Sequence, residues 1–196
     1  VLQFFNPHPN NIETVIQRWL PIFTYITKRA ITEAQGNHDI AITNITPTKT
    51  VVGQGYTMQI NITVKNEGDP TETFRVTIYA NTTSIASQTI TLISENSKTV
   101  TFTWNTTGFV KGNYIIKAIA DTVLGERDVA DNTLINGSVL VTVPGDVDGD
   151  RKVDMVDIVQ LILHFGTKIS DPGYVPNCDI NGDGYINMED IVIAIL

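Results

Sequence analysis

Residues 39–69 read DIAITNITPTKTVVGQGYTMQINITVKNEGD, and this stretch decides which fold we expect. Apolar and polar residues alternate through Tyr56–Asn66 and, over a shorter run, through Asp39–Thr46. This alternation is the period of a strand that buries one face. Turn residues separate the runs at Gly53–Gly55 and end the second run at Gly68–Pro70. The stretch therefore predicts two strands whose outer, threonine-rich faces are in contact with water.

Five more runs of the same kind follow, each bounded by glycine, asparagine or aspartate. Seven short strands at this spacing are typical of an antiparallel β-sandwich, so we expect a mainly β chain. The predicted strands are Asp39–Thr46, Tyr56–Asn66, Glu72–Ala80, Ile85–Ile93, Thr99–Trp104, Asn113–Thr122 and Leu134–Val143.

The same region resembles a known family. Together with residues 39–69, the stretches TVTFTWNTTGFVKGNYIIKAIAD (99–121) and GERDVADNTL (125–134) are similar to the CARDB domain, a module of prokaryotic cell-surface proteins. The resemblance covers about residues 39–143. It implies an immunoglobulin-like sandwich and a role in adhesion, spacing or assembly rather than in catalysis.

The corner formed by Glu126, Asp128, Asp131 and Asn132 has two interpretations. These side chains could hold a cation with their oxygen atoms. They could instead cap a turn through side-chain to backbone hydrogen bonds, which is the commoner role of Asp and Asn in turns.

The negative charge of the chain is concentrated in its last quarter. The chain has a formal net charge of -8, and residues 144–196 carry ten acidic and three basic groups. Nucleic acid is therefore excluded as a partner, because binding phosphates needs a basic face. The same segment contains a repeat with an offset of 33 residues: GDVDGDRKVDMVDIV at 145–159 matches CDINGDGYINMEDIV at 178–192.

Each copy fits the calcium-loop pattern D-x-[DN]-x-[DN] with an acid at the twelfth position. Calcium prefers six to eight hard oxygen ligands, and a tight loop with alternate residues pointing inward supplies them. Two Ca²⁺ ions are thus expected, one per loop. The first loop would use Asp146, Asp148, Asp150, the Lys152 carbonyl, Asp154 and Asp157, and the second Asp179, Asn181, Asp183, the Tyr185 carbonyl, Asn187 and Asp190.

This duplication of a loop followed by a short helix is similar to a type I dockerin. The resemblance implies a small helical fold, two calcium sites and docking onto a cohesin domain. Two departures matter. Positions 10 and 11 are Met155-Val156 and Met188-Glu189 instead of the Ser or Thr common in dockerins that bind cohesin. Position 6 of the first loop is Arg151 where glycine usually adopts a positive φ, at a cost of about 1 kcal/mol.

The N-terminal segment predicts an extended start followed by an apolar helix. Residues 12–26 carry apolar side chains at helical spacing, and Pro21 should kink or split the helix. Such a helix is too apolar to remain unpacked, so we expect it to contact another part of the chain or another molecule. The residues expected to mediate assembly are Val1, Leu2, Phe4, Phe5, Trp19 and Phe23.

Export to the cell surface is favoured by five N-x-[ST] sequons, although a threonine-rich β protein also generates such motifs by chance. They lie at Asn44, Asn61, Asn81, Asn105 and Asn136. The single Cys178 cannot form an intrachain disulfide, so cysteine usage does not indicate a compartment. No apolar stretch approaches the roughly 18 residues that span a bilayer.

The chain lacks the motifs of hydrolases, zinc proteases and phosphate-binding loops, so we expect no enzyme activity. The first hypothesis is a structural or assembly protein of a prokaryotic cell surface, which we expect to be archaeal. This protein would be the subunit of a filament or tube. The alternative is an adhesion or anchoring module that binds cohesin. A glycan-binding sandwich with Phe102, Trp104 and Tyr114 as a stacking platform is a weaker third. The expected division is 1–37, 38–143 and 144–196.

Overall fold

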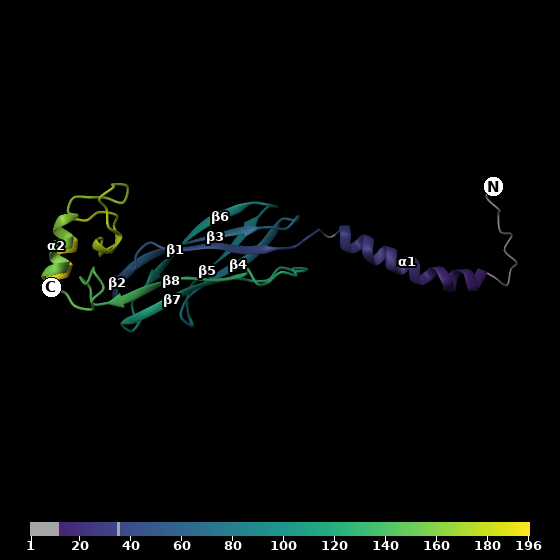
Figure 1. Ribbon diagram of the computed structural model, residues 1–196, viewed down its shortest axis with the longest axis horizontal. Coiled ribbons are helices and arrows are strands. Elements are labelled where there is room, and N and C mark those ends of the chain that lie inside the picture. The colour runs from purple at the N-terminus through teal and green to yellow at the C-terminus, as the bar shows by residue number, and fades with distance from the viewer. Residues whose placement is uncertain (1–11, 35) are drawn as a thin grey trace. The chain divides into compact units, whose positions relative to one another are not determined.

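The computed structural model describes residues 12–34 and 36–196 and divides the chain into two units, 1–37 and 38–196. In the first unit, helix α1 spans Ile12–Ala34 and continues through Pro21 without being split (Figure 1). Between residues 16 and 28, where its side chains are described, the apolar ones are exposed, Trp19 to 50% and Phe23 to 61%. The expected assembly residues Val1, Leu2, Phe4 and Phe5 lie outside the described residues.

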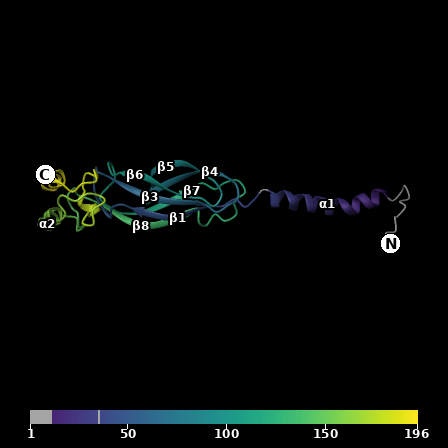
Figure 2. The ribbon, with the colours of Figure 1, turned by 90° about the horizontal axis from the view of Figure 1, so that it is seen from above.

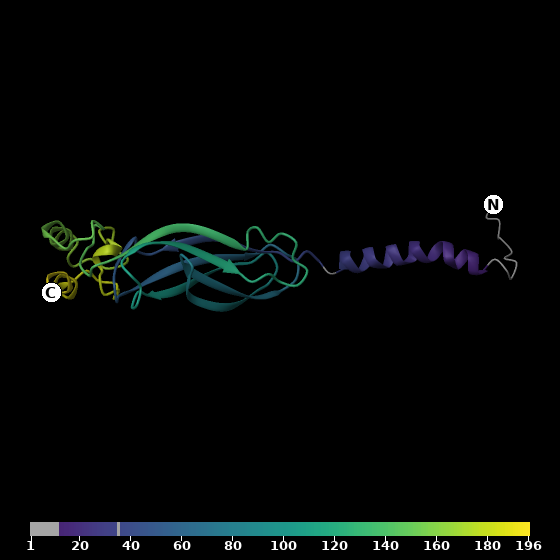
Figure 3. The same ribbon diagram turned by 90° about the horizontal axis from the view of Figure 1, so that it is seen from below.

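The second unit contains two β-sheets. The strands of the first sheet lie in the order β1 (Ile40–Pro47), β3 (Thr57–Asn66) and β6 (Ser97–Asn105). The second sheet has the order β2 (Val51–Gly53), β8 (Thr133–Thr142), β7 (Gly112–Ala120), β4 (Glu72–Ala80) and β5 (Thr83–Leu92). The two sheets form the layers of a sandwich (Figure 3), which confirms the mainly β, immunoglobulin-like expectation.

Strand β2 has no counterpart among the predicted segments. It pairs with β8 in parallel, with Val51 opposite Leu140 and Gly53 opposite Thr142, whereas the other ladders are antiparallel. With three residues, β2 is too short to show alternation, so the sequence contained no signal for it.

The inward-facing residues of both sheets form the main core. In the first sheet, Ile60 pairs with Phe102 and Ile62 with Val100, and these side chains pack against Val76 of the second sheet's inner face within the same core. Fully burying such a side chain contributes about 1.5–3 kcal/mol. The alternation of the printed sequence therefore sets the register of the ladders.

The aromatic residues proposed as a stacking platform belong to this core. Trp104 is fully buried and makes edge-on contacts with Phe109 and Tyr114, at centroid distances of 5.2 and 5.6 Å. Phe102 is buried in the same core. Rings buried like those of Trp104 and Phe102 cannot stack on a sugar, so the glycan-binding interpretation is wrong for these two residues, and Tyr114 is partly buried against the same core.

Residues 144–196, called here the C-terminal module, contain α2 (Met155–Leu163), the 3₁₀ turn η2 (Pro176–Cys178) and α3 (Met188–Ile195). The module lies at one end of the sandwich (Figure 2). Its own core is formed by Val147, Leu161, Cys178, Ile180, Ile186 and Ala194. Burial raises the pKa of the Cys178 thiol to about 11. Such a buried thiol is shielded from disulfide formation with another molecule.

The helices α2 and α3 begin at the tenth position of their acidic loops, at Met155 and Met188. Asp154 caps α2 by accepting a hydrogen bond from the Val156 amide, and Asn187 caps α3 by accepting one from the Glu189 amide. In return, Asp157 and Asp190 accept hydrogen bonds from the backbone of the capping residues. These reciprocal capping boxes start each helix inside its acidic loop.

Candidate metal centre

Three carboxylates of the first acidic loop converge on one point. Asp146, Asp148 and Asp157 each offer one oxygen atom, and these three oxygens lie within 4.8 Å of one another. Asp146 and Asp157 are buried, and Asp148 is exposed at the mouth of the cluster. The donors are hard oxygens from a single short loop, which is the ligand chemistry that calcium prefers.

The backbone of the loop wraps around the two buried carboxylates. Asp146 accepts hydrogen bonds from the amides of Gly149 at 2.7 Å and Arg151 at 2.8 Å. Asp157, eleven residues later in the loop, accepts hydrogen bonds from the amides of Val147 at 2.8 Å and Asp154 at 2.9 Å. These bonds fix the first and twelfth positions beside each other, so the loop is closed by its own ligand residues.

The second loop repeats these contacts with the same offset of 33 residues. Asp179 accepts hydrogen bonds from the amides of Gly182 and Gly184, at 2.8 and 3.0 Å. Asp190 accepts hydrogen bonds from the amides of Ile180 and Asn187, at 2.7 and 2.9 Å. The two loops therefore have one architecture, although the second has an amide, Asn181, at its third position.

The remaining expected ligands lie on the same loops and bond to the backbone two residues ahead. Asp150 accepts a hydrogen bond from the Lys152 amide at 2.8 Å, and Asp183 accepts one from the Tyr185 amide at 2.8 Å. Asp154 and Asn187 serve as the helix caps. Lys152 and Tyr185, whose carbonyl groups are the expected seventh-position ligands, donate their amides to Asp150 and Asp183.

The sixth position distinguishes the loops. Arg151 has a φ of 75° and Gly184 a φ of 88°, so both residues are in the left-handed region. Glycine reaches this conformation without steric cost, whereas a residue with a Cβ does not. The first loop thus has one more carboxylate at its third position, and it carries backbone strain that the second loop avoids.

The pKa values of two loop carboxylates, Asp148 and Asp190, are raised. For Asp190, burial raises the pKa, backbone hydrogen bonds from Asn187, Asn181 and Ile180 lower it, and the charge of Asp179 raises it, with a net upward shift. For Asp148, the hydrogen bond from the Asp150 amide lowers the pKa, but burial and the charges of three neighbouring carboxylates outweigh it. A bound cation would remove this repulsion.

Sequence reasoning missed the groups that support the loops from outside. The hydroxyl of Thr142, at the end of β8, donates to Asp146 Oδ2 at 2.6 Å, and the hydroxyl of Tyr174 donates to Asp179 Oδ2 at 2.6 Å. Each first-position carboxylate therefore receives one hydroxyl hydrogen bond. No periodicity marks either residue, although Thr142 stands only four residues before Asp146.

A second support comes from the segment between β1 and β2. Lys49 is 6% exposed, and its Nζ donates to the carbonyl oxygen of Asp179. Asn177 Oδ1 accepts hydrogen bonds from the amides of Thr50 at 3.1 Å and Val51 at 3.3 Å. Tyr56 packs against the cores of both the sandwich and the module. The module is therefore joined to the sandwich at the η2 turn and at the start of the second acidic loop.

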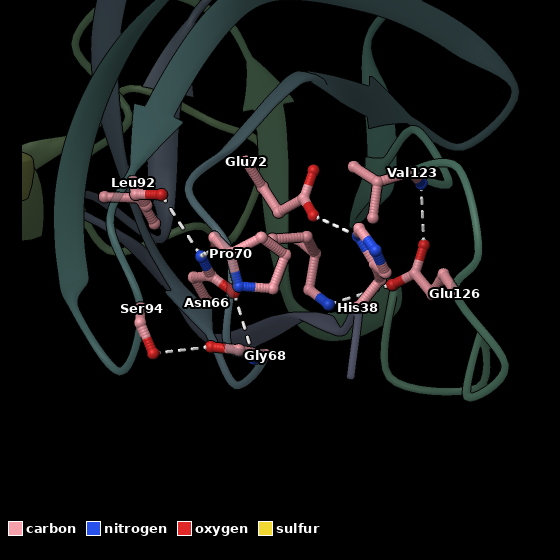
Figure 4. Close-up of polar contacts among 10 residues, drawn as sticks. His38, Asn66, Gly68, Pro70, Glu72, Leu92, Ser94, Val123 and Glu126 are labelled. Atoms are coloured by element: carbon pink, nitrogen blue, oxygen red, sulfur yellow. Dashed lines mark hydrogen bonds and ion pairs between the residues drawn. The ribbon is translucent and has the colours of Figure 1, made fainter. Parts of the chain in front are cut away.

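The corner at Glu126 divides into two kinds of side chain. Glu126 accepts hydrogen bonds from the amides of Ile40 and Val123 (Figure 4), at 2.9 and 2.8 Å. Asp128 accepts one from the Ala130 amide at 3.1 Å. These two residues cap the turn, as the commoner interpretation expected. Asp131 and Asn132 behave differently, because buried side-chain atoms of both make no hydrogen bond.

The sequons differ in accessibility. Asn44, Asn81, Asn105 and Asn136 are exposed, whereas Asn61 is half-buried on the central strand β3, where its Oδ1 accepts a hydrogen bond from Thr101 at 2.7 Å. The side-chain Nδ2 of Asn44 donates a hydrogen bond to the hydroxyl of Thr46, the third residue of the same sequon, at 3.0 Å. Among the described residues, no helix is long and apolar enough to cross a membrane.

The fold thus defines a class of protein in which an immunoglobulin-like sandwich is followed by a duplicated loop–helix unit. A family model described as CARDB matches residues 37–135, and one described as the dockerin type I domain matches residues 144–195. The CARDB match covers half of the chain, and the chain belongs to this family and carries a type I dockerin domain behind it. Both are non-catalytic modules, and dockerin domains bind calcium.

The chain is also similar to curated relatives and to a solved structure. The chain is 29% identical over 85 residues to cellulosomal-scaffolding proteins B and A of Acetivibrio thermocellus, an alignment that covers 43% of this chain but 10% and 4% of those proteins. The CARDB domain of a Pyrococcus furiosus protein in complex with di-metal ions is 28% identical, covers 55% of this chain and 96% of that domain, and has a TM-score of 0.47.

Proposed function

We propose that this chain is a non-enzymatic, calcium-stabilised module of a prokaryotic cell surface whose dockerin docks onto a protein partner, a cohesin domain in the first instance. In this proposal, the chain has three functional parts. Residues 1–37 provide a contact segment, 38–143 a rigid spacer, and 144–196 the docking module. One Ca²⁺ binds in each loop, at the ligands predicted from the sequence.

The observation that carries the proposal is the apolar surface of the two helices that leave the loops. On α2, Met155 is 72% exposed, and Val156, Val159, Ile162 and Leu163 are exposed beside it. On α3, Met188, Val192 and Ile195 are exposed. Because the helices start from capped loops, an ion in each loop would fix the direction of these faces. Exposed apolar helical faces on a small module support a docking role.

The departures at positions 10 and 11 indicate the chemistry of the partner. Met155, Val156 and Met188 are exposed at positions where cohesin-binding dockerins often carry hydroxyl groups. The partner surface should therefore be apolar, since a polar surface would lose hydrogen bonds to water without replacement.

Docking can be tested with a panel of purified cohesin domains by isothermal titration calorimetry, using the full chain in CaCl₂ and in EDTA. Calcium-dependent binding that is lost in Met155→Asp or Met188→Asp supports the proposal. The exposed Val110→Asp of the sandwich serves as the matched control, because Val110 is 75% exposed and far from the module in sequence. Binding of none of the cohesins, or binding that both kinds of variant retain, would contradict it.

A second candidate function, self-assembly into a filament or tube, is favoured by α1. Its exposed apolar residues Ile16, Trp19, Leu20 and Phe23 line a shallow hydrophobic surface. A head-to-tail contact between copies would propagate as a filament unless its rotation closes a ring. Electron microscopy with calcium and with chelator separates the candidates: ordered fibres support self-assembly, and single particles that still bind cohesin support the docking module.

A further inference from the structure

The last residue of β8 is bonded to the first ligand residue of the first acidic loop. Thr142 is 2% exposed, and its hydroxyl donates a hydrogen bond to Asp146 Oδ2 at 2.6 Å. Asp146 is itself 3% exposed, and its carboxylate also accepts hydrogen bonds from the amides of Gly149 and Arg151. Three donors therefore hold this carboxylate, two from the loop and one from the sandwich.

The position of this hydroxyl is set by the sandwich and not by the loop. β8 leads directly into the module (Figure 1). Thr142 lies opposite Gly53 in the ladder between β8 and β2, and its carbonyl oxygen accepts a hydrogen bond from the Gln54 amide at 2.8 Å. Threonine is branched at Cβ, which restricts rotation about χ1. A backbone fixed by the ladder therefore also limits where the hydroxyl can point.

The first loop packs directly on the two strands that hold Thr142. A Cβ atom added to Gly149, at the fourth position of the loop, would lie 3.0 Å from Cγ2 of Val51 and 3.5 Å from Cδ2 of Leu140. Val51 belongs to β2 and Leu140 to β8, and the two residues are paired in the ladder. Packing this close holds the loop against the strands, so the hydrogen bond from Thr142 to Asp146 is kept in place from both ends.

The second loop lacks this connection, although its backbone is hydrogen-bonded in the same way. The hydroxyl that donates to Asp179 Oδ2 belongs to Tyr174, which is a residue of the module. The contact from the sandwich, made by Lys49, reaches the backbone carbonyl of Asp179 instead of its carboxylate. Within residues 36–196, the sandwich thus donates a hydrogen bond to a ligand carboxylate of the first loop alone.

The carboxylate that Thr142 holds is one of the three that converge in the first loop. The oxygens offered by Asp146, Asp148 and Asp157 lie within 4.8 Å of one another. A residue that donates a hydrogen bond to a metal-binding carboxylate fixes its orientation, and loss of such a residue lowers metal affinity roughly 10- to 100-fold. Thr142 stands in this relation to the first loop, although it belongs to the sandwich.

We propose that Thr142 is the positioning residue through which the sandwich raises the calcium affinity of the first loop. The inference rests on the proposed binding of Ca²⁺ by the acidic loops. Coupling between two sites is reciprocal, so an ion in the first loop stabilises the pairing of β8 with β2 in return. In the second loop, Tyr174 has the same role from within the module, so its first ligand is oriented without the sandwich.

The test is a titration of the full ¹⁵N-labelled chain with EGTA-buffered calcium, followed by amide NMR spectra. Amides of residues 147–157 report on the first loop and those of 180–190 on the second. Thr142→Val keeps the shape of the side chain and its preference for strands. In this variant, the midpoint of the first loop should rise about tenfold in free calcium, and by more than that of the second. Thr142→Ser retains the hydroxyl and should keep most of the affinity.

The matched control is Tyr174→Phe, which removes the corresponding hydroxyl at the second loop. It should reverse the pattern, with a larger loss of affinity at the second loop than at the first. The reciprocal effect is measured by hydrogen exchange. Saturating CaCl₂ should slow exchange of the Gln54 amide in the wild-type chain, and Thr142→Val should reduce this protection.

The inference is wrong if Thr142→Val shifts both loops equally, because a purely structural role of the residue would destabilise the module as a whole. It also fails if Thr142→Val binds calcium like the wild-type chain, or if calcium leaves the exchange of the Gln54 amide unchanged. These results do not affect the proposed calcium loops, whereas a wild-type chain without any response at 147–157 contradicts both proposals.

Discussion

The sandwich and the C-terminal module are stabilised by different physical effects. The sandwich core contains 23 buried apolar residues contributed by both sheets, whereas the core of the module contains six. The module instead buries four carboxylates, those of Asp146, Asp157, Asp179 and Asp190. Burial of apolar side chains stabilises the first region without any ligand, while buried like charges destabilise the second until a cation neutralises them.

This difference predicts which of the two regions calcium should stabilise. A structure that binds an ion only when folded gains free energy by mass action, and a region with a small core depends on that gain. The sandwich should therefore respond to calcium weakly and the module strongly. Four experiments test this comparison, and the first has the largest expected effect.

Removal of calcium should unfold the module and leave the sandwich folded. At a free calcium concentration one hundred times the dissociation constant, each site contributes about 2.7 kcal/mol of stability. Differential scanning calorimetry in EDTA should lose a transition that CaCl₂ restores, while the β-sheet circular dichroism persists. One transition that is identical in both buffers would show that the two regions do not differ in this respect.

Single substitutions at the first loop position should remove one ion each. Asp146→Ala and Asp179→Ala delete a buried carboxylate that organises its own loop through two or more amide hydrogen bonds. Native mass spectrometry should find one ion fewer bound to the acidic loops in each variant and both ions missing in the double variant. Asp171→Ala, outside both loops, is the control, and an equal loss of ions there would refute the ligand assignment.

The hydrogen bond from Lys49 to the Asp179 carbonyl joins the sandwich to the module. Removal of this joint should destabilise the module. Lys49→Met keeps the buried chain but leaves the Asp179 carbonyl without its donor, at a cost of about 1–3 kcal/mol. The melting temperature of the module should fall, and that of the sandwich should change little. The exposed Lys111→Met controls for loss of charge. If both variants melt alike, the joint contributes nothing to stability.

Relief of strain in the first loop should give the smallest effect, and it should be stabilising. Arg151→Gly removes the steric cost of a positive φ, worth about 1 kcal/mol. Chemical denaturation in CaCl₂ measures the gain. Lys152→Gly, at a position outside the left-handed region, should destabilise by about 0.5–1 kcal/mol instead. Destabilisation by Arg151→Gly would mean that the arginine side chain makes a contribution larger than the strain.

The features that could be predicted from the sequence are those encoded by neighbouring residues. The ligand loops were visible because their acidic residues fall within a dozen consecutive positions, and the positive φ of Arg151 followed from its place in that pattern. The alternation that predicted β3 and β6 also set their register. These signals are local, so a single sequence contains them.

The features that could not be predicted depend on contacts between residues that are far apart in the sequence. Lys49 reaches Asp179 across 130 residues, and β2 exists only because β8 lies beside it. The turn residues Asp131 and Asn132 look the same in sequence as the capping residue Asp128, and only packing leaves their atoms unpaired. Tertiary contacts of this kind have no periodicity to detect.

The placement of β8 has a mechanical consequence. The C-terminal module follows directly after Thr142, so a partner that pulls on α2 or α3 pulls along β8. That strand lies between β2 and β7 and is hydrogen-bonded to both. A force along its axis loads the flanking hydrogen bonds together in shear instead of opening them one by one. The sandwich is thus arranged to resist tension that is applied through its C-terminal strand.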